Sequence, residues 1–502
     1  MAGETTSSKK FRLRANPALY EINTWVWLEQ LSARFGRTIK LGDVPDEEWD
    51  SLAAIGFDAV WLMGIWRRSA ESRRMALADP ANPPAFDRAL PGWKAEDVVG
   101  SPYAVAAYVP DTRIGTWDDV DKASGRLHAR GMALFVDFVG NHTAVDDPWT
   151  RSNPDFYVQG TKEDFDKDPG SFYRVETASG TKFIALGKDP YFPPWRDTAQ
   201  LNHFNAGLRA MEIAGLRTIA SHCDGVRCDM AMLQLNDIFG RLWGHLLNGA
   251  AAPSTEFWAD AHAAVPELTL LAEAYWGTEG RLIDLGFSFA YDKGMYDAVR
   301  DSRIADVRNQ LGNELEVKGH FAHFLENHDE ARAPSVFGKI KLPAAATLMG
   351  TLPGMRFYHQ GELQGYTIHW PITLRTVAEE PTDPDIEALF AKILRETKDD
   401  VFHAGVWKLL QITQERDQTF SNLIGYEWRS GKEWRVIVVN LSSEASQGWV
   451  HFEDGRFDPR NYIFHDRLDD AKYVRGGESL GSEGLFVRKD AFQAHLFEVV
   501  PS

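Results

Sequence analysis

Residues 131–142 read Gly-Met-Ala-Leu-Phe-Val-Asp-Phe-Val-Gly-Asn-His, an apolar run that ends in polar side chains. Gly131 is a helix stop signal, and the run behind it has the length and composition of a buried β-strand. Three other segments place an acidic side chain at or near the end of such a run: residues 225–229, 270–274 and 326–329. A buried charge is costly, so four such segments predict one site assembled from several strand ends.

The chain offers enough strands around these segments for a barrel. Apolar β-like runs alternate with amphipathic helical stretches from about residue 19 to about residue 403. The predicted strands cover residues 18–22, 57–62 and 132–136, and further strands end at Asp229, at Glu273, near Ala290, at Glu326 and near Tyr358. This alternation predicts an α/β fold, a parallel (β/α)8 TIM barrel.

Two long connections and the C-terminal part extend the predicted barrel. Residues 67–100 and 142–200 are too long for simple loops, and the second predicts a small subdomain inserted after strand 3. Hairpin signals after about residue 403 predict an all-β sandwich. We therefore expect the barrel at residues 1–142 and 200–403, the inserted subdomain at 143–199 and a C-terminal β-sandwich domain at 404–502.

Composition narrows the class of ligand. Of 502 residues 44% are apolar and 25% are charged, which is typical of a soluble globular protein. The net charge of −18 argues against nucleic acid and anionic membranes as main partners. No apolar run has the length of a membrane span and no signal peptide is visible, which favours a cytoplasmic protein. Cys223 and Cys228 lack metal-site spacing, so we expect two inert buried thiols.

The acidic residues suit glycoside chemistry. A retaining glycosidase needs a carboxylate nucleophile and a carboxylic acid about 5–5.5 Å apart. Asp229 and Glu273 would end neighbouring strands, which lie about 4.8 Å apart. Arg227 precedes Asp229 by two residues and would face the same way, which would keep the aspartate ionised. Asp329 would add a third negative charge, which favours the protonated form of a neighbouring glutamic acid.

These segments resemble the motifs of the α-amylase family, glycoside hydrolase family 13. The match rests on residues 137–142, 225–229, the strand of Glu273 and residues 326–329, in the family's order. Gln200-Leu201-Asn202 looks like the motif near the end of the inserted domain, and residues 352–358 with Gly361-Glu362 resemble the eighth-strand motif. The resemblance spans about residues 19–362 and implies that the substrate is an α-glucan or an oligosaccharide.

The resemblance implies a role for each carboxylate. Asp229 would be the nucleophile, and Glu273 would be the general acid and then the general base. Asp329 would bind hydroxyls of the distorted sugar and stabilise the transition state, while Arg227 would orient Asp229. A purely structural role is the alternative for the three carboxylates, but a buried unpaired carboxylate costs too much to be incidental.

Other substrate-binding residues also follow from the resemblance. Tyr103 would stack on the sugar, and His142 and His328 would hydrogen-bond it. Asp137 would be a structural partner within the site. The alternatives are ordinary packing for Tyr103, structural roles for the two histidines and a loop anchor for Asp137.

The chain departs from the family at two places. Met232 and Leu233 stand where many endo-acting α-amylases carry a lysine and a histidine that hold the acceptor side of a long glucan. Their absence leaves room for exo-action, for small oligosaccharides or for transfer.

Asn141 matches a position that binds structural calcium in many members, so it is the candidate metal ligand. No cofactor is required by this interpretation, and the remaining calcium ligands are not placed by the sequence.

The leading prediction is a retaining hydrolase of α-1,4-linked glucans or gluco-oligosaccharides. The alternative is a transglycosylase, isomerase or phosphorylase that uses an α-glucoside donor and a different acceptor. A third hypothesis is a non-catalytic relative that kept the barrel. The sequence leaves open the linkage, the chain length, endo against exo action, calcium dependence and oligomeric state.

Overall fold

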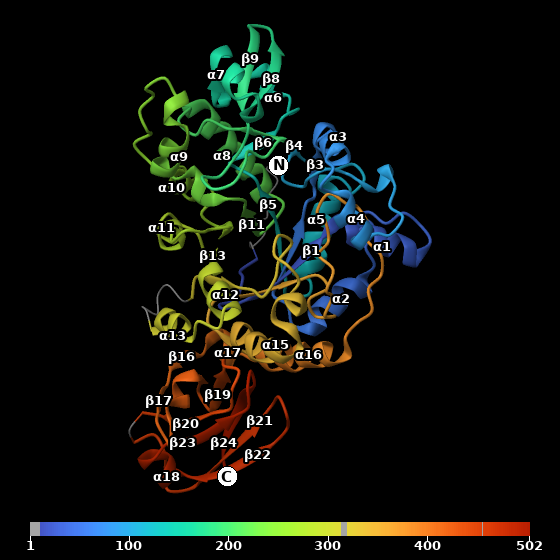
Figure 1. Ribbon diagram of the computed structural model, residues 1–502. Coiled ribbons are helices and arrows are strands. Elements are labelled where there is room, and N and C mark those ends of the chain that lie inside the picture. Colours follow the sequence, from blue (N-terminus) through green and yellow to red (C-terminus); the bar gives the residue numbers. More distant parts are fainter. Residues whose placement is uncertain (1–10, 313–318, 454) are drawn as a thin grey trace, which may run out of the picture.

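The computed structural model describes residues 11–312, 319–453 and 455–502 (Figure 1). Parallel strands close into a barrel, which confirms the predicted TIM fold. In order around the barrel they are β1 (Ala18–Asn23), β2 (Ala59–Met63), β5 (Ala133–Phe138), β11 (Gly225–Cys228), β12 (Thr269–Ala272), β13 (Phe289–Tyr291), β14 (Phe321–His323) and β15 (Met355–His359).

Helices surround the barrel and fill its connections. Those that follow its strands are α1 (Thr24–Phe35), α2 (Asp46–Ile55), α5 (Trp117–His128), α8 (Ala206–Ala220), α9 (Asn236–Trp243), α10 (Phe257–Ala264), α11 (Glu279–Asp284), α12 (Lys293–Arg300), α13 (Ile304–Gly312), α15 (Ala333–Thr351), α16 (Pro384–Thr397) and α17 (Val401–Ala404). Every residue of β1, β2, β5 and β15 is buried. Such strands are covered on both faces, which explains why they appear in the sequence as continuous apolar runs.

The pairing register of β11 with β5 and β12 determines the level at which the acidic side chains leave the barrel. In β11 Arg227 pairs with Asp137 of β5 on one side and with Leu271 of β12 on the other. The ladder continues beyond the strands, because the Glu273 N–H donates to the Cys228 carbonyl over 3.0 Å. Asp229 and Glu273 therefore leave two neighbouring strands at the same level, as predicted.

Strand β14 ends earlier than expected. The prediction placed its end at Glu326, whereas β14 stops at His323. Residues 324–329 lie outside the ladder, and the Asn327 side chain stabilises a turn at their end: its Oδ1 accepts hydrogen bonds from the Asp329 and Glu330 N–H groups. This turn places Asp329 above the barrel.

Two segments rise above the carboxyl ends of the strands. The first holds β3 (Trp66–Arg68), α3 (Ala70–Ala78), α4 (Pro83–Ala89) and β4 (Val105–Pro110). The second holds β6 (His142–Ala144), α6 (Trp149–Ser152), β7 (Gln159–Gly160), α7 (Lys162–Lys167), β8 (Phe172–Thr177), β9 (Gly180–Ala185) and β10 (Thr198–Gln200). Strands β6 and β10 pair with each other, so the second segment leaves and re-enters the barrel at one place. The predicted boundaries at residues 143–199 stay a prediction.

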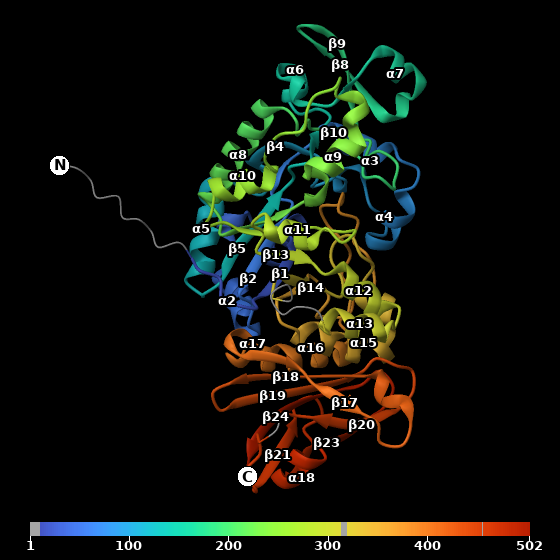
Figure 2. The same cartoon turned by 90° about the vertical axis from the view of Figure 1, so that its left-hand side faces the viewer.

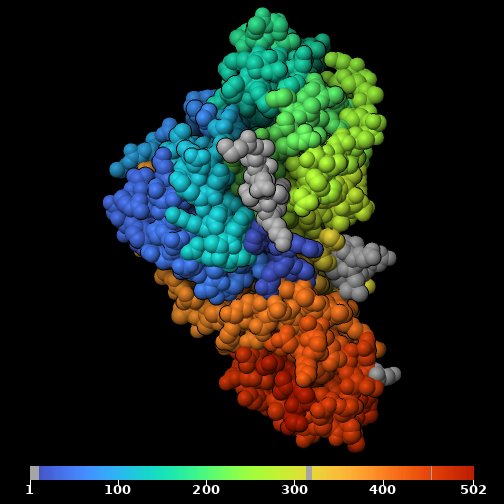
Figure 3. All heavy atoms as spheres, turned by 180° about the vertical axis from the view of Figure 1, so that it is seen from behind, coloured from blue at the N-terminus to red at the C-terminus, as the bar shows by residue number. Residues whose placement is uncertain are grey.

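The C-terminal part is all-β and lies at the opposite end of the molecule (Figures 2 and 3). One sheet has the order β16 (Val406–Leu409), β18 (Leu423–Ser430), β19 (Glu433–Asn440), β24 (Ala494–Pro501), β21 (Asn461–Asp466) and β22 (Lys472–Gly476). The other has β17 (Gln411–Thr413), β20 (Ser446–His451) and β23 (Leu485–Lys489), with α18 (Gly477–Ser482) nearby. Apolar side chains fill the space between the sheets. This arrangement confirms the predicted all-β domain.

The C-terminal sheet is joined to the barrel through α15. The Trp428 indole N–H donates to the Thr351 carbonyl over 2.8 Å, and the Tyr426 hydroxyl lies 2.5 Å from the Thr351 hydroxyl. Cys223 and Cys228 are buried and are not joined in a disulfide. In the part of the chain that the structure describes, no helix combines the length and apolarity that crossing a bilayer requires.

Candidate active site

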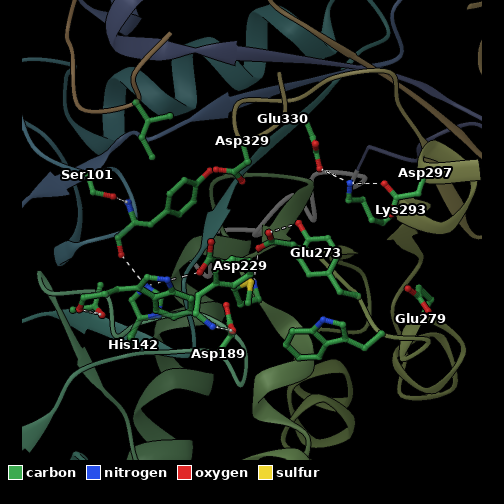
Figure 4. Close-up of a pocket in the computed structure, with 18 of the residues that line it drawn as sticks. Ser101, His142, Asp189, Asp229, Glu273, Glu279, Lys293, Asp297, Asp329 and Glu330 are labelled. Atoms are coloured by element: carbon green, nitrogen blue, oxygen red, sulfur yellow. Dashed lines mark hydrogen bonds and ion pairs between the residues drawn. The ribbon is translucent and has the colours of Figure 1, made fainter. Parts of the chain in front are cut away.

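A cavity of about 920 Å³ opens at the carboxyl ends of the barrel strands (Figure 4). Asp229, Glu273 and Asp329 all line it. They follow β11, β12 and β14, so the three predicted carboxylates meet in one place although 100 residues separate the first from the last. This is the face on which barrel enzymes hold their reactive groups.

One buried guanidinium gathers the three carboxylates. Arg227 Nη1 lies 2.6 Å from Asp229 Oδ1, and Nη2 lies 2.8 Å from Glu273 Oε2. Nη2 is also 4.0 Å from Asp329 Oδ2. Because Arg227 is buried within the barrel, its charge acts in a poorly solvated place and keeps all three acids close to one point.

Of these three carboxylates, Glu273 is the one most inclined to hold a proton. Burial raises the pKa of its carboxyl to about 7, Arg227 opposes the shift, and Asp229 and Asp329 add to it. Glu273 Oε2 accepts a 2.7 Å hydrogen bond from the Met230 N–H, and Oε1 accepts one of 2.8 Å from the Tyr275 hydroxyl. Burial also raises the pKa of Asp229, and Arg227 again opposes the shift.

Asp329 lies at the end of a chain of charged groups. His328 Nδ1 is 2.5 Å from Glu21 Oε1, and His328 Nε2 is 3.1 Å from Asp329 Oδ2. Burial alone would lower the pKa of His328, but Asp329 and Glu21 raise it well above the ordinary value. Burial would raise the pKa of Asp329, but His328 is the main group that holds it well below its usual range. Asp329 is therefore ionised while Glu273 can stay protonated.

His142 also lies close to Asp229. Its Nε2 donates to the Tyr103 carbonyl over 3.1 Å, and its Nδ1 lies 3.2 Å from the Asn141 amide. Burial lowers the pKa of His142 to about 4, so the ring is neutral near pH 7. His142 Nε2 is 3.9 Å from Asp229 Oδ2, and the residue lines the cavity.

Tyr103 and Asp137 take different places. The Tyr103 ring lines the cavity and stacks on His328 at 5.1 Å between centroids. Asp137 does not line the cavity; its carboxylate accepts hydrogen bonds from the Gly64 N–H at 2.6 Å and the Trp61 indole at 3.2 Å. Burial raises the pKa of Asp137 to about 6. These contacts suit the structural role that the sequence suggested for it.

The chain is similar in sequence to several proteins of known name. No family model matches the chain. The chain is 23% identical over 424 residues to α-amylase MalA of Haloarcula japonica, a match covering 80% of this chain and 53% of that protein. It is 22% identical over 368 residues to an oligo-1,6-glucosidase of Parageobacillus thermoglucosidasius, which covers 63% of this chain and 60% of the relative. The chain thus spans about half to three fifths of these two relatives.

Solved structures share the fold over nearly the whole chain. The maltogenic α-amylase AmyB of Thermotoga neapolitana superposes with a TM-score of 0.68 at 19% identity, covering 97% of this chain and 99% of that one. An α-amylase of Lactobacillus plantarum gives a TM-score of 0.65 at 19% identity, with coverage of 97% and 99%. These similarities support the resemblance to the α-amylase family that the sequence motifs indicate.

The family's calcium position does not have a calcium-like environment here. Asn141 is buried, its Oδ1 accepts a 3.1 Å hydrogen bond from the Gln200 amide, and its own amide faces His142. Calcium takes several oxygen ligands, among them carboxylates. Among the described residues, the metal-like cluster of acids and histidine is Asp466, Asp469 and His495, far away in the C-terminal domain. The donor set at Asn141 therefore does not fit the ion, and no step below uses it.

The two departures from endo-acting family members lie in the core. Met232 and Leu233 are 0% and 1% exposed, in a short 3-10 helix below the cavity. Neither residue is among those that line the cavity.

Several lining residues were not predicted. They follow β11, β12 or β13 or belong to the second inserted segment, and include Asp189, Phe192, Trp195, Met230, Tyr275, Trp276, Glu279, Lys293 and Asp297. Glu21 was also missed, although a charged residue inside the apolar run 18–22 is a signal that could have identified it. Loop residues gave no such signal because their position depends on how the loops fold over the barrel.

Proposed function

We propose that this protein is a retaining glycoside hydrolase that acts on α-1,4-linked glucans or gluco-oligosaccharides. The observation that carries the proposal is the pairing of Arg227 with both Asp229 and Glu273, beside an ionised Asp329. It supplies a carboxylate nucleophile and a carboxylic acid in one cavity, as the retaining reaction requires. Relatives named α-amylase and oligo-1,6-glucosidase support the choice of substrate class.

In the first half-reaction Asp229 attacks the anomeric carbon while Glu273 gives its proton to the leaving glycosidic oxygen. Arg227 favours the ionised form of Asp229 before attack. Asp329 and His328 lie beside the reacting sugar, where the negative charge of Asp329 stabilises the positive charge that develops on the ring. The products are a leaving sugar with a free hydroxyl and a glycosyl ester on Asp229.

In the second half-reaction a water molecule or a sugar hydroxyl attacks the ester. Glu273, now ionised, takes the proton of the attacking group and returns to its starting state. Two inversions at the anomeric carbon give net retention. Water makes the protein a hydrolase, and a sugar hydroxyl makes it a transglycosylase or isomerase.

Transfer to a sugar is the second candidate because aromatic surface lies on the acceptor side. Trp276 is 43% exposed, and it lines the cavity together with Tyr275 and Phe192. Aromatic faces of this kind suit the apolar face of a sugar ring. A phosphate acceptor is disfavoured, because the carboxylates that line the cavity are Asp189, Asp197, Asp229, Glu273, Glu279, Asp297, Asp329 and Glu330.

The cation that could offset them is already engaged. Among the described residues that line the cavity Lys293 is the single lysine or arginine, and its ammonium lies 2.9 Å from Asp297 and 2.8 Å from Glu330. A phosphorylase would need free positive charge for its acceptor. A non-catalytic role is also disfavoured, since a raised pKa at Glu273 beside an ionised Asp329 has no evident structural use.

The test compares Asp229→Asn and Glu273→Gln with Asp297→Asn, which removes a cavity carboxylate that does not touch Arg227. We expect kcat on maltooligosaccharides to fall roughly 10⁴-fold or more in the first two and less than about 10-fold in the third. Wild-type activity should decline as pH rises through about 7, where Glu273 loses its proton. Near-normal turnover by Asp229→Asn or Glu273→Gln would contradict the proposal.

The leaving group separates the two roles. Glucosyl fluoride loses fluoride without needing a proton, so Glu273→Gln should still form the glycosyl-enzyme from it. Asp229→Asn should not. Equal loss of fluoride release in both variants would mean that the two roles are assigned wrongly.

A further inference from the structure

The cavity has two different ends. Figure 4 shows Ser101 at one side, Glu279 and Asp297 at the other, and Asp229, Glu273 and Asp329 between them. Because Glu273 would protonate the leaving oxygen, the leaving sugar belongs on the side of Glu279. The sugar that becomes bound to Asp229 then lies toward Ser101. Whether a longer glucan can extend past this sugar depends on the space behind Ser101.

Two segments that are far apart in sequence meet behind Ser101. Residues 89–99 of the first inserted segment and residues 373–378, which follow β15, are joined by backbone hydrogen bonds. The Val99 N–H donates to the Thr373 carbonyl at 2.8 Å, the Arg375 N–H to the Asp97 carbonyl at 2.9 Å, and the Ala378 N–H to the Ala89 carbonyl at 2.8 Å. We call residues 97–101 and 368–375 the end wall.

Side chains consolidate the end wall. Buried Arg68 donates to the Gly100 carbonyl at 2.5 Å and to the Ile372 carbonyl at 2.9 Å, so one guanidinium joins both halves. Arg375 pairs with Glu29 at 3.0 Å and with Asp97 at 3.3 Å. Val98, Trp370 and Leu374 of the wall belong to an apolar cluster that also contains Val26 and Phe86. Removing such a wall would break many bonds at once, so it is a fixed boundary.

The end wall is also tied to the catalytic residues. His369 donates from Nε2 to the His328 carbonyl at 2.8 Å, and Arg332 donates to the Ile368 carbonyl at 3.1 Å. Ile372 and Ser101 of the wall line the same cavity as Tyr103, which stacks on His328. The wall therefore begins directly beside the residues that hold the donor sugar.

We infer that the end wall closes the donor side of the cavity after one sugar, so that the protein is exo-acting and removes single glucose units from the non-reducing ends of its substrates. This inference rests on the proposed function. It names the part of the substrate that can be reached: a terminal glucose with a free non-reducing end. Internal bonds of a long glucan cannot reach Asp229, because the preceding sugar would have to occupy the space of the wall.

The test uses 4-nitrophenyl α-maltopentaoside, either free or carrying a 4,6-O-ethylidene group on its non-reducing glucose, with products separated by mass. The free substrate should lose one glucose at a time from that end. The blocked substrate should react at least ~100-fold more slowly, because a misplaced donor sugar loses its alignment with Asp229. The inference would be overturned if both substrates reacted at similar rates. It would also be overturned by early release of maltose that carries the 4-nitrophenyl group.

Two variants of the wall make the test specific. Ile372→Gly removes a side chain that lines the cavity, while Ile368→Gly makes the same change at a wall position that does not line it. The rate on blocked relative to free substrate should rise roughly 10-fold in Ile372→Gly and stay unchanged in Ile368→Gly. An unchanged ratio in both variants would contradict the role of the wall. If the unmodified protein did not turn over 4-nitrophenyl α-glucoside at all, that result would instead refute the proposed function.

Discussion

Glu21 is a carboxylate on β1 that has no exposure to solvent. Its Oε1 lies 2.5 Å from His328, and its Oε2 has no hydrogen-bond partner among the described residues. A buried carboxylate with an unsatisfied oxygen is stable only where a strong positive partner compensates it. Here that partner is the His328 imidazolium, which in turn favours the ionised form of Asp329.

Glu21→Gln keeps the shape of this side chain and removes its charge. The pKa of His328 should fall, so His328 would lose its proton at a lower pH and Asp329 would lose its positive neighbour. We expect kcat to fall roughly 10- to 100-fold, the range that the loss of one buried charge-assisted hydrogen bond implies. The pH dependence of kcat and KM checks this. A variant that melts earlier but has the parent pH profile would show that Glu21 is only a packing residue.

The three carboxylates could be predicted from the sequence and Glu21 could not, for a physical reason. Asp229, Glu273 and Asp329 follow apolar runs, so strand order alone brings them together. The contact of Glu21 with His328 joins residues 307 positions apart and depends on closure of the barrel between β1 and β15. A charge in a strand shows that a partner is needed, but not which residue it is.

The strand β11 shows how an element positions the site. Gly225 begins β11, and a Cβ there would overlap the ring of Phe135 on β5. Arg227 and Asp229 follow on the same chain, so any shift of β11 would move both. The close approach of β11 to β5 therefore requires glycine at this position for reasons of space.

Gly225→Ala should lower the free energy of unfolding by about 1–3 kcal/mol, because the added methyl group overpacks the barrel. Gly215→Ala is the matched control: it lies within α8 with open space around it, so it should stabilise by about 0.5–1 kcal/mol. Denaturant unfolding of both variants measures these changes. A Gly225→Ala protein as stable as the parent would mean that β11 and β5 are not packed as described.

Strands could be predicted where the sequence has a regular apolar pattern. The barrel strands could be predicted because each is an apolar run, and only the end of β14 was misplaced by more than two residues. The end wall was not predicted, because its bonds join Val99 to Thr373 and Asp97 to Arg375 across the mouth of the barrel. No periodicity in either segment indicates that contact.

The C-terminal domain and the cavity lie at opposite ends of the molecule. The C-terminal sheets lie at the end of the barrel away from the inserted segments (Figure 2). Tyr426 and Trp428 belong to the same apolar core as the barrel strands, so this domain supports α15 and not the cavity. The cavity is formed by loops at the other end. The all-β C-terminal part could be predicted from the sequence, because the change from alternating α and β to β alone is visible there.

The central claim is that Asp229 becomes bonded to the sugar within a single site. A 5-fluoro-α-glucosyl fluoride should trap this ester, because the ring fluorine slows both steps while the good leaving group keeps the first step fast. Peptide mass spectrometry should find one glucosyl adduct on Asp229, and none on the Asp229→Asn variant. An adduct on Glu273 or Asp329, or turnover with inversion at the anomeric carbon, would contradict the account.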